Sequence, residues 1–165
     1  MWGIIAVVSV VLIGVAAYYI TRFMKGSIKL SVDRSTYTSG DPITGSFLLE
    51  TKKSLEGTLT VSLIGTKVST YYDHENRRKT RRDEFFRDRV VIERRRKFKA
   101  GNKRFKFEVP SPQMQEPGFM DSKIGRLITG ILNSGRNSRM EWKVEARLDM
   151  KGVDLAASKR VNLTM

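Results

Sequence analysis

The chain has 165 residues, a formal net charge of +14 at pH 7 and 40% hydrophobic residues. This length leaves room for one domain and an accessory segment, but not for two full domains. The lack of cysteine excludes disulfides and thiolate chemistry, and one histidine, His74, cannot form an imidazole cluster, so we expect no metal or other cofactor.

Residues 2–20 are apolar and carry no charged side chain. At about 1.5 Å of rise per residue, such a helix nearly matches a hydrocarbon core of about 30 Å. We therefore predict a transmembrane helix over residues 1–24, with the lipid bilayer as its partner. Aromatic rings near its two ends and the cations that follow it are the expected interface anchors. They are Trp2, Tyr18, Tyr19, Arg22 and Lys25.

A cleavable signal peptide is the alternative interpretation of this segment. The apolar run is longer than a normal signal core, and no basic region precedes it, which favours an anchor. Positive charge follows the helix, so the positive-inside rule predicts a single-pass protein whose C-terminal domain faces the cytoplasm. In the membrane of a virion that orientation would be reversed or undefined.

Beyond a short linker at residues 25–27, residues 28–165 change to the period-two alternation of half-buried strands. The clearest case is 141–149, where Trp142, Val144, Ala146 and Leu148 alternate with charged residues. Further strands are expected at 28–32, 43–51, 58–63, 85–92, 104–109 and 155–163. Turns are expected at 39–42, 56–57, 100–102 and 151–152. About seven short strands of this kind predict a mainly β, two-sheet, immunoglobulin-like sandwich.

Residues 121–135 interrupt the strand pattern with apolar residues at helical spacing. We predict an inserted amphipathic helix whose apolar stripe packs over an open end of the sandwich. The alternative is a docking helix that lies on the membrane or on a partner. The residues of that stripe are Ile124, Leu127, Ile128, Ile131 and Leu132.

Most of the positive charge lies in residues 77–104, which hold 14 Lys and Arg against four acids. Such a field attracts an acidic protein surface, anionic lipid headgroups or nucleic acid. The first group of candidate binding residues is expected on a loop and the second at a strand end. They are Arg77, Arg78, Lys79, Arg81 and Arg82, followed by Arg94, Arg95, Arg96 and Lys97.

Four segments in this order resemble the N-terminal domain of the arrestin superfamily, especially its α-arrestin branch. They are YTSGDPITG at 37–45, VSLIG at 61–65 followed by Tyr71 and Tyr72, GNKRFKFEVP at 101–110, and WKVEARL at 142–148. The resemblance implies an arrestin-like β-sandwich that acts as an adaptor. No second arrestin domain and no Pro-Pro-x-Tyr motif are present, so the family's interdomain switch and its functional residues are not carried over.

The leading functional hypothesis is a membrane-anchored adaptor or scaffold whose basic face binds an anionic partner. The alternative is a structural subunit of a large membrane-associated assembly, such as a membrane-containing virion, and either role suggests work within a complex. Nucleic-acid binding is disfavoured, because no recognised module accompanies the basic stretch. An extracellular adhesion domain has only the sequon at Asn162 to support it.

An enzyme is not expected. The acidic residues alternate outward on strands instead of converging, and no glycine-rich phosphate loop is present.

Overall fold

The computed structural model describes residues 24–114, 121–133 and 138–164, with the side chains of residues 132 and 133 left out. The predicted transmembrane helix therefore lies outside the described residues, except for Met24, and so do Trp2, Tyr18, Tyr19 and Arg22. Among the helices that are described, none has the length and apolar character needed to cross a membrane.

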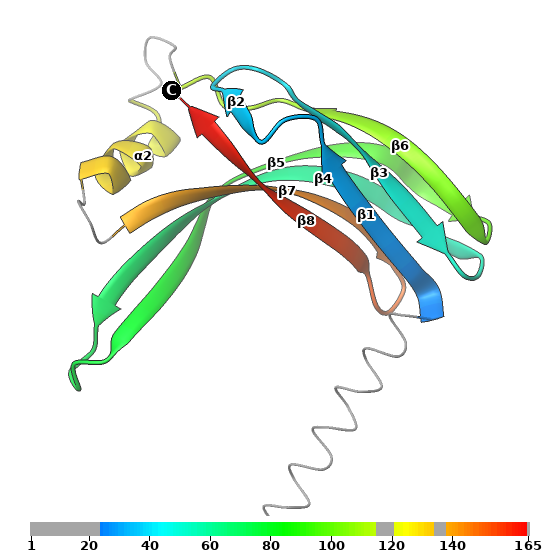
Figure 1. Ribbon diagram of the computed structural model, residues 1–165, viewed down its shortest axis with the longest axis horizontal. Coiled ribbons are helices and arrows are strands. Elements are labelled where there is room, and N and C mark those ends of the chain that lie inside the picture. Colours follow the sequence, from blue (N-terminus) through cyan, green and yellow to red (C-terminus); the bar gives the residue numbers. More distant parts are fainter. Residues whose placement is uncertain (1–23, 115–120, 134–137, 165) are drawn as a thin grey trace, which may run out of the picture.

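Two sheets form the domain (Figure 1). The three-stranded sheet has the order β1-β3-β6, and the five-stranded sheet has the order β2-β8-β7-β4-β5. All pairs are antiparallel except the parallel pair of β2 with β8. The strands are β1 (Gly26–Val32), β2 (Thr36–Thr38), β3 (Ile43–Thr51), β4 (Leu55–Tyr72), β5 (Arg78–Phe98), β6 (Gly101–Val109), β7 (Ser138–Met150) and β8 (Leu155–Thr164).

The predicted two-sheet, mainly β architecture is confirmed, but three local predictions are wrong. The short strand β2 was missed; its Tyr37 is buried, and its hydroxyl donates to the carbonyl of Thr44 at 3.0 Å. The dipeptide 56–57 lies inside β4, because the chain already reverses at residues 52–54. The linker at 25–27 is absent, since Lys25 is buried and β1 begins at Gly26.

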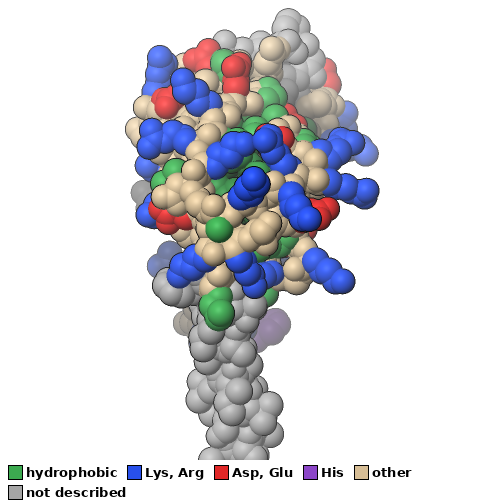
Figure 2. All heavy atoms as spheres, turned by 90° about the vertical axis from the view of Figure 1, so that its right-hand side faces the viewer, with side chains coloured by type: hydrophobic (Ala, Val, Ile, Leu, Met, Phe, Trp, Pro, Cys, Tyr) green, Lys and Arg blue, Asp and Glu red, His purple; other side chains and the backbone are tan. Residues whose placement is uncertain are grey.

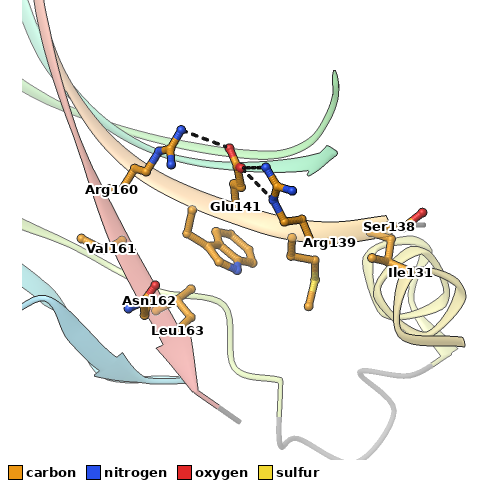
Figure 3. Close-up of a pocket in the computed structure, with 10 residues that line it drawn as sticks. Ile131, Ser138, Arg139, Glu141, Arg160, Val161, Asn162 and Leu163 are labelled. Atoms are coloured by element: carbon orange, nitrogen blue, oxygen red, sulfur yellow. Dashed lines mark hydrogen bonds and ion pairs between the residues drawn. The ribbon is translucent and has the colours of Figure 1, made fainter. Parts of the chain in front are cut away.

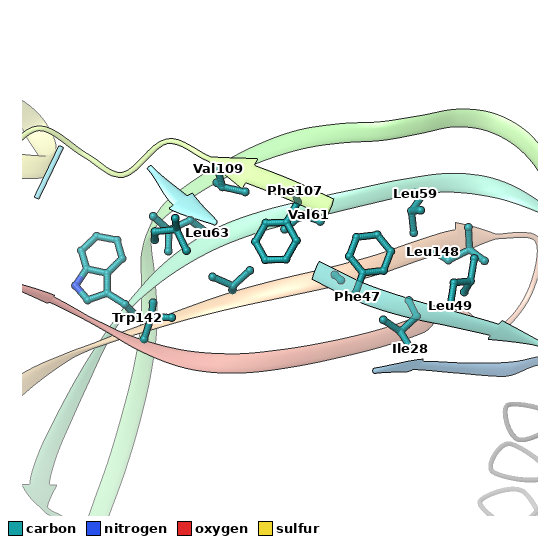
Figure 4. Close-up of a cluster of buried hydrophobic side chains, with 14 of the residues drawn as sticks. Ile28, Phe47, Leu49, Leu59, Val61, Leu63, Phe107, Val109, Trp142 and Leu148 are labelled. Atoms are coloured by element: carbon teal, nitrogen blue, oxygen red, sulfur yellow. The ribbon is translucent and has the colours of Figure 1, made fainter. Parts of the chain in front are cut away.

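The core lies between the two sheets, where aliphatic side chains pack around a few aromatic rings (Figure 4). Phe47 of β3 is 1% exposed and stacks on Phe105 and Phe107 of β6, with ring centroids 5.3 and 6.3 Å away. At the other end of the core, Trp142 of β7 meets the rings of Phe85 and Phe86 edge-on at 5.4 and 5.5 Å. Burial of these apolar rings on both sheets holds the layers together.

Gly65 of β4 makes room for Trp142. A Cβ at this glycine would lie 2.7 Å from the indole and 2.8 Å from the ring of Phe85. Glycine is therefore required for both rings to pack this closely on β4.

The helix α2 (Lys123–Asn133) confirms the predicted inserted helix over most of its length, while residues 134–135 lie outside the described residues. It contacts β7 and β5 (Figure 1). Ile128 and Ile131 are buried, Ile124 packs partly against the core, and Leu127 is 49% exposed. Two of the proposed docking residues, Ile128 and Ile131, therefore serve the packing of the helix.

Candidate functional site

Strand β5 carries most of the predicted binding residues, and it places them at opposite ends of the molecule. The first group was expected on a loop, but Arg78, Lys79, Arg81 and Arg82 belong to β5 itself and only Arg77 lies in the turn. At about 3.3 Å per residue, roughly 40 Å of strand separates this group from Arg94–Lys97. The two groups therefore form two separate surfaces.

The first surface belongs to a two-stranded hairpin arm, residues 70–80, where β4 and β5 pair beyond Ser138, the first residue of β7. Its turn is closed by Asp73, whose carboxylate accepts from the backbone N–H of Glu75 at 3.0 Å and of Arg77 at 2.9 Å. Tyr71 and Tyr72 are exposed on it. The arm is thus a defined structure and not an irregular loop.

Acids close by neutralise most of the cations on the arm and just beside it. Lys79 pairs with Asp73 at 2.9 Å, Arg81 pairs with Asp83 at 2.8 Å, and Arg77 pairs with Glu75. The hydrogen bond that Arg81 donates to Asp83 raises the pKa of Arg81 above its usual value. Of the five predicted residues here, only Arg78 and Arg82 have no ion pair within the described part of the chain.

The outer face of the five-stranded sheet is also neutralised, by a lattice of ion pairs across β5, β7 and β8. Arg87 donates two hydrogen bonds of 2.7 Å to Glu84, which lower the pKa of that carboxyl. Glu141 accepts two bonds from Arg139, at 2.9 and 3.0 Å, and lies 3.8 Å from Arg160. These cations hold the pKa of Glu141 below its usual value, with the Arg139 bond as the main cause.

The two arginines that bind Glu141 stand over a pocket of 540 Å³ between α2 and strands β7 and β8 (Figure 3). Apolar side chains line its other side, among them Ile131, Trp142 and Leu163. The pocket opens where β8 leaves β7, since the last pair of that ladder is Trp142 with Val161. The charges above it are already paired, so it offers little attraction to an anion.

The second surface is the basal end of the sandwich, defined by the start of β1 and the turns at 52–54, 99–100 and 151–154. Lys25 fastens the start of β1 there, because its Nζ donates to the carbonyls of Lys151 at 3.2 Å and Val153 at 3.0 Å. The Lys25 residue is 8% exposed and its ammonium is held by these two carbonyls, which does not fit the predicted membrane-interface anchor. It holds the β7–β8 turn instead.

Exposed lysines crowd the basal end, and Figure 2 shows Lys and Arg side chains spread over the side that carries the β3–β4 and β5–β6 turns, with acidic ones mainly towards its margins. We call five of them, which have no ion pair in the described residues, the basal lysines. They are Lys53, Lys97, Lys99, Lys103 and Lys151.

Few acids at the basal end remain to balance the basal lysines. Glu50 is held by Lys29 at 2.7 Å, and the pKa of Glu50 is lowered mainly by that bond. Glu93 pairs with Arg96, and Asp154 pairs with Arg147 at 2.8 Å. Two further acids, Glu56 opposite Lys97 and Asp149 opposite Thr58, offset only part of the charge of the basal lysines, so the basal end keeps a net positive charge.

A hollow of 360 Å³ opens at the basal end, between the end of β3 and the β5–β6 turn. Leu49 and Phe98 line its apolar part, and Lys97, Lys99 and Lys103 line the rest. An apolar floor with cationic neighbours suits an amphipathic or anionic partner better than a reaction centre. Within the described ranges, no group of three His, Asp or Glu residues is placed to hold a metal ion.

The two sheets form a β-sandwich with an arrestin-like fold. Among solved structures, the fold is similar to Spo0M, the sporulation control protein from Bacillus subtilis, with a TM-score of 0.56 and 12% sequence identity. The match covers 86% of this chain and 50% of that one, so this chain spans about half the length of Spo0M. No protein-family model and no curated protein matches the sequence.

Proposed function

We propose that the protein is a membrane-anchored adaptor or scaffold, not an enzyme, whose basal end docks on an anionic surface. The observation that carries this proposal is the set of unpaired basal lysines around the point where the chain enters β1. An apolar run long enough to span a bilayer precedes that point in the sequence. A domain held there presents the basal end to the membrane from which it emerges.

The energetics favour lipid headgroups, or an acidic partner held among them, as the docking surface. Each Lys near an anionic leaflet contributes about 1 kcal/mol, and the attraction fades over about 8–10 Å at physiological salt. Five lysines in one end face are enough for reversible docking when an anchor supplies proximity. By the positive-inside rule, we place the domain on the cytoplasmic side.

The test uses the full chain in lipid nanodiscs, either neutral or containing phosphatidylglycerol, with amide hydrogen exchange as the readout. We expect the turns at 52–54 and 99–100 to gain protection in anionic discs only, and to lose it when salt is added. The turn of the hairpin arm, residues 73–77, is the internal control and keeps its exchange rate. Equal exchange of the basal turns in both kinds of disc would contradict docking.

The anchor is tested separately by washing membranes that contain the full chain. An integral helix keeps the protein in the pellet through both high salt and alkaline carbonate, whereas an electrostatically bound protein is released. Release by carbonate would remove the anchor from the proposal. Purification in mild detergent then separates the two roles, since a fixed stoichiometric complex favours an architectural subunit over an adaptor.

A further inference from the structure

A second pocket, of 570 Å³, lies on the outer face of the five-stranded sheet beside the basal end. Thr58 and Thr60 of β4 line it, and the neighbouring strands supply cations on both sides. On β7, Arg147 is the register partner of Thr60 and Asp149 is the partner of Thr58. On β5, the partner of Thr60 is Val91.

A β-bulge concentrates charge on the β5 side of this pocket. The register steps from the pair Gly57 and Arg96 to the pair Leu59 and Glu93, so two consecutive arginines, 94 and 95, lie opposite Thr58. Arg95 has a left-handed backbone with a φ of 45°, which is unusual for any residue except glycine. A bulge in this place brings both Arg94 and Arg95 to one pocket, where regular alternation would separate them.

The bulge also orients a hydroxyl group. The backbone N–H of Arg95 donates to Oγ1 of Thr58 at 3.3 Å. Because this oxygen accepts that bond, the hydroxyl hydrogen of Thr58 is left to donate elsewhere. An anion in the pocket would be a suitable acceptor.

The cations of the pocket are all arginines, whereas those of the basal turns are mainly lysines. Arg147 is fixed by two bonds to Asp154, at 2.8 and 3.2 Å. Arg89, Arg94 and Arg95 have no ion pair within the described residues, and Asp149 is the one acid of the lining. A guanidinium group binds two oxygens of a phosphate at once, which an ammonium group cannot do.

We propose that this arginine pocket binds a phosphate monoester, supplied by a lipid headgroup or by a small soluble molecule. A terminal phosphate carries about −1.5 to −2 charges at pH 7 and three acceptor oxygens, enough for several guanidinium groups and the Thr58 hydroxyl. A phosphodiester has one charge and two such oxygens, and therefore fits less well. The proposal deepens the docking function for the lipid source, but binding of a soluble ligand does not depend on that function.

The experiment has a lipid arm and a soluble arm, both with the full chain. In the lipid arm, nanodiscs of equal surface charge contain phosphatidic acid, a monoester, or phosphatidylglycerol, a diester, and hydrogen exchange follows residues 58–60 and 89–95. In the soluble arm, inositol trisphosphate is titrated calorimetrically into the protein in neutral detergent. We expect protection by phosphatidic acid over phosphatidylglycerol, binding of the soluble monoester, or both.

Matched variants separate specific binding from general attraction. The double substitution R89Q/R94Q removes two pocket arginines, while K53Q/K99Q removes the same charge from the basal turns. We expect R89Q/R94Q to weaken monoester binding by about tenfold per arginine and K53Q/K99Q to leave the monoester preference intact. The substitution Thr58→Val keeps every charge, and it should weaken monoester binding by a smaller factor than R89Q/R94Q does. Urea denaturation confirms that each variant is folded.

The outcomes distinguish this proposal from docking itself. Equal weakening by both double variants, with no preference for the monoester, would overturn the arginine pocket and leave electrostatic docking in place. Arginine-dependent binding of inositol trisphosphate without any response of the basal turns to anionic lipid would support the pocket and contradict docking. No binding in either arm would overturn the pocket.

Discussion

The two ends of β5 carry similar runs of cations, yet their electrostatics differ. At the hairpin arm, Arg77, Lys79 and Arg81 each have an acid within a few residues along the hairpin. At the basal end, only Arg96 is paired, whereas Arg94, Arg95 and Lys97 form no ion pair within the described residues even though Glu93 and Glu56 are close to them in sequence or register. A run of basic residues therefore offers free charge to an anionic partner only where the fold leaves the cations unpaired.

The cations of the hairpin end have a structural explanation. β5 is an edge strand of the five-stranded sheet, with one long side that no other strand of the described residues pairs with. Lys and Arg on such an edge discourage pairing with a second copy of the chain. Exposed ion pairs contribute about 0–1 kcal/mol each, so the arm gains solubility rather than much stability.

The largest expected effect comes from removing the aromatic packing that supports the hairpin end of β5. Trp142→Ala deletes the indole against which Phe85 and Phe86 pack, and it should lower the free energy of unfolding by about 3–5 kcal/mol. Urea denaturation measures the loss, and hydrogen exchange should rise most along β4 and β5 near the arm. Leu127→Ala on the exposed face of α2 is the control and should cost under about 1 kcal/mol. A loss that small for Trp142→Ala would contradict the packing.

The next prediction compares two triple variants that remove the same charge from opposite ends of β5. The triple variant K53Q/K99Q/K103Q should weaken docking on anionic nanodiscs by about 3 kcal/mol, because each lysine near the leaflet contributes about 1 kcal/mol. The readout is the protection of the basal turns against hydrogen exchange.

The matched triple variant at the other end of β5, R77Q/K79Q/R81Q, removes the same charge from cations that are already paired. It should change docking by much less than the basal triple variant does. Equal effects of the two variants would mean that net charge alone controls docking and that the pairing of the cations is irrelevant.

A smaller change tests how closely the sheet fits Trp142. Gly65→Ala places a methyl group 2.7 Å from the indole, and such overpacking costs about 1–3 kcal/mol. A glycine in an open position gives the contrast: a Cβ at Gly130 of α2 meets no atom within 4 Å, so Gly130→Ala should stabilise the helix by up to about 1 kcal/mol. Thermal denaturation of both variants gives the signs, and a stabilising Gly65→Ala would contradict the close contact.

The sequence predicts the sandwich because apolar alternation reports which residues face a core. The segment 141–149 is an example: apolar residues from Trp142 to Leu148 alternate with charged ones, and the structure forms β7 there. The length of β5 could not be predicted in this way, because its arm carries almost no apolar residues and is held by backbone pairing with β4. The two groups of basic residues were visible, but whether each cation finds an acid depends on register and on turns such as the one closed by Asp73.

The arginine pocket was even less predictable. Thr58 and Thr60 give no signal in the sequence, and Arg147 lies more than fifty residues from Arg94 along the chain. The bulge that brings Arg94 and Arg95 together depends on a one-residue mismatch between β4 and β5. Only the predicted importance of residues 94–97 pointed to this region.

The smallest expected effect concerns the ion-pair lattice and its dependence on pH. The pKa of Glu141 lies below the ordinary glutamate value of 4.5, first because of the Arg139 bond and then because of nearby Arg160 and Arg82. Stability from this ionised group is therefore complete above pH 4.5 and is lost as the pH falls through the lower pKa of the folded state. Because its arginine partners are exposed to solvent, Glu141→Gln should cost only about 0.5 kcal/mol at pH 7. Urea titrations of both proteins should converge below that pKa, where the native carboxyl is protonated and resembles the amide, and a gap that persists in acid would show that charge is not the cause.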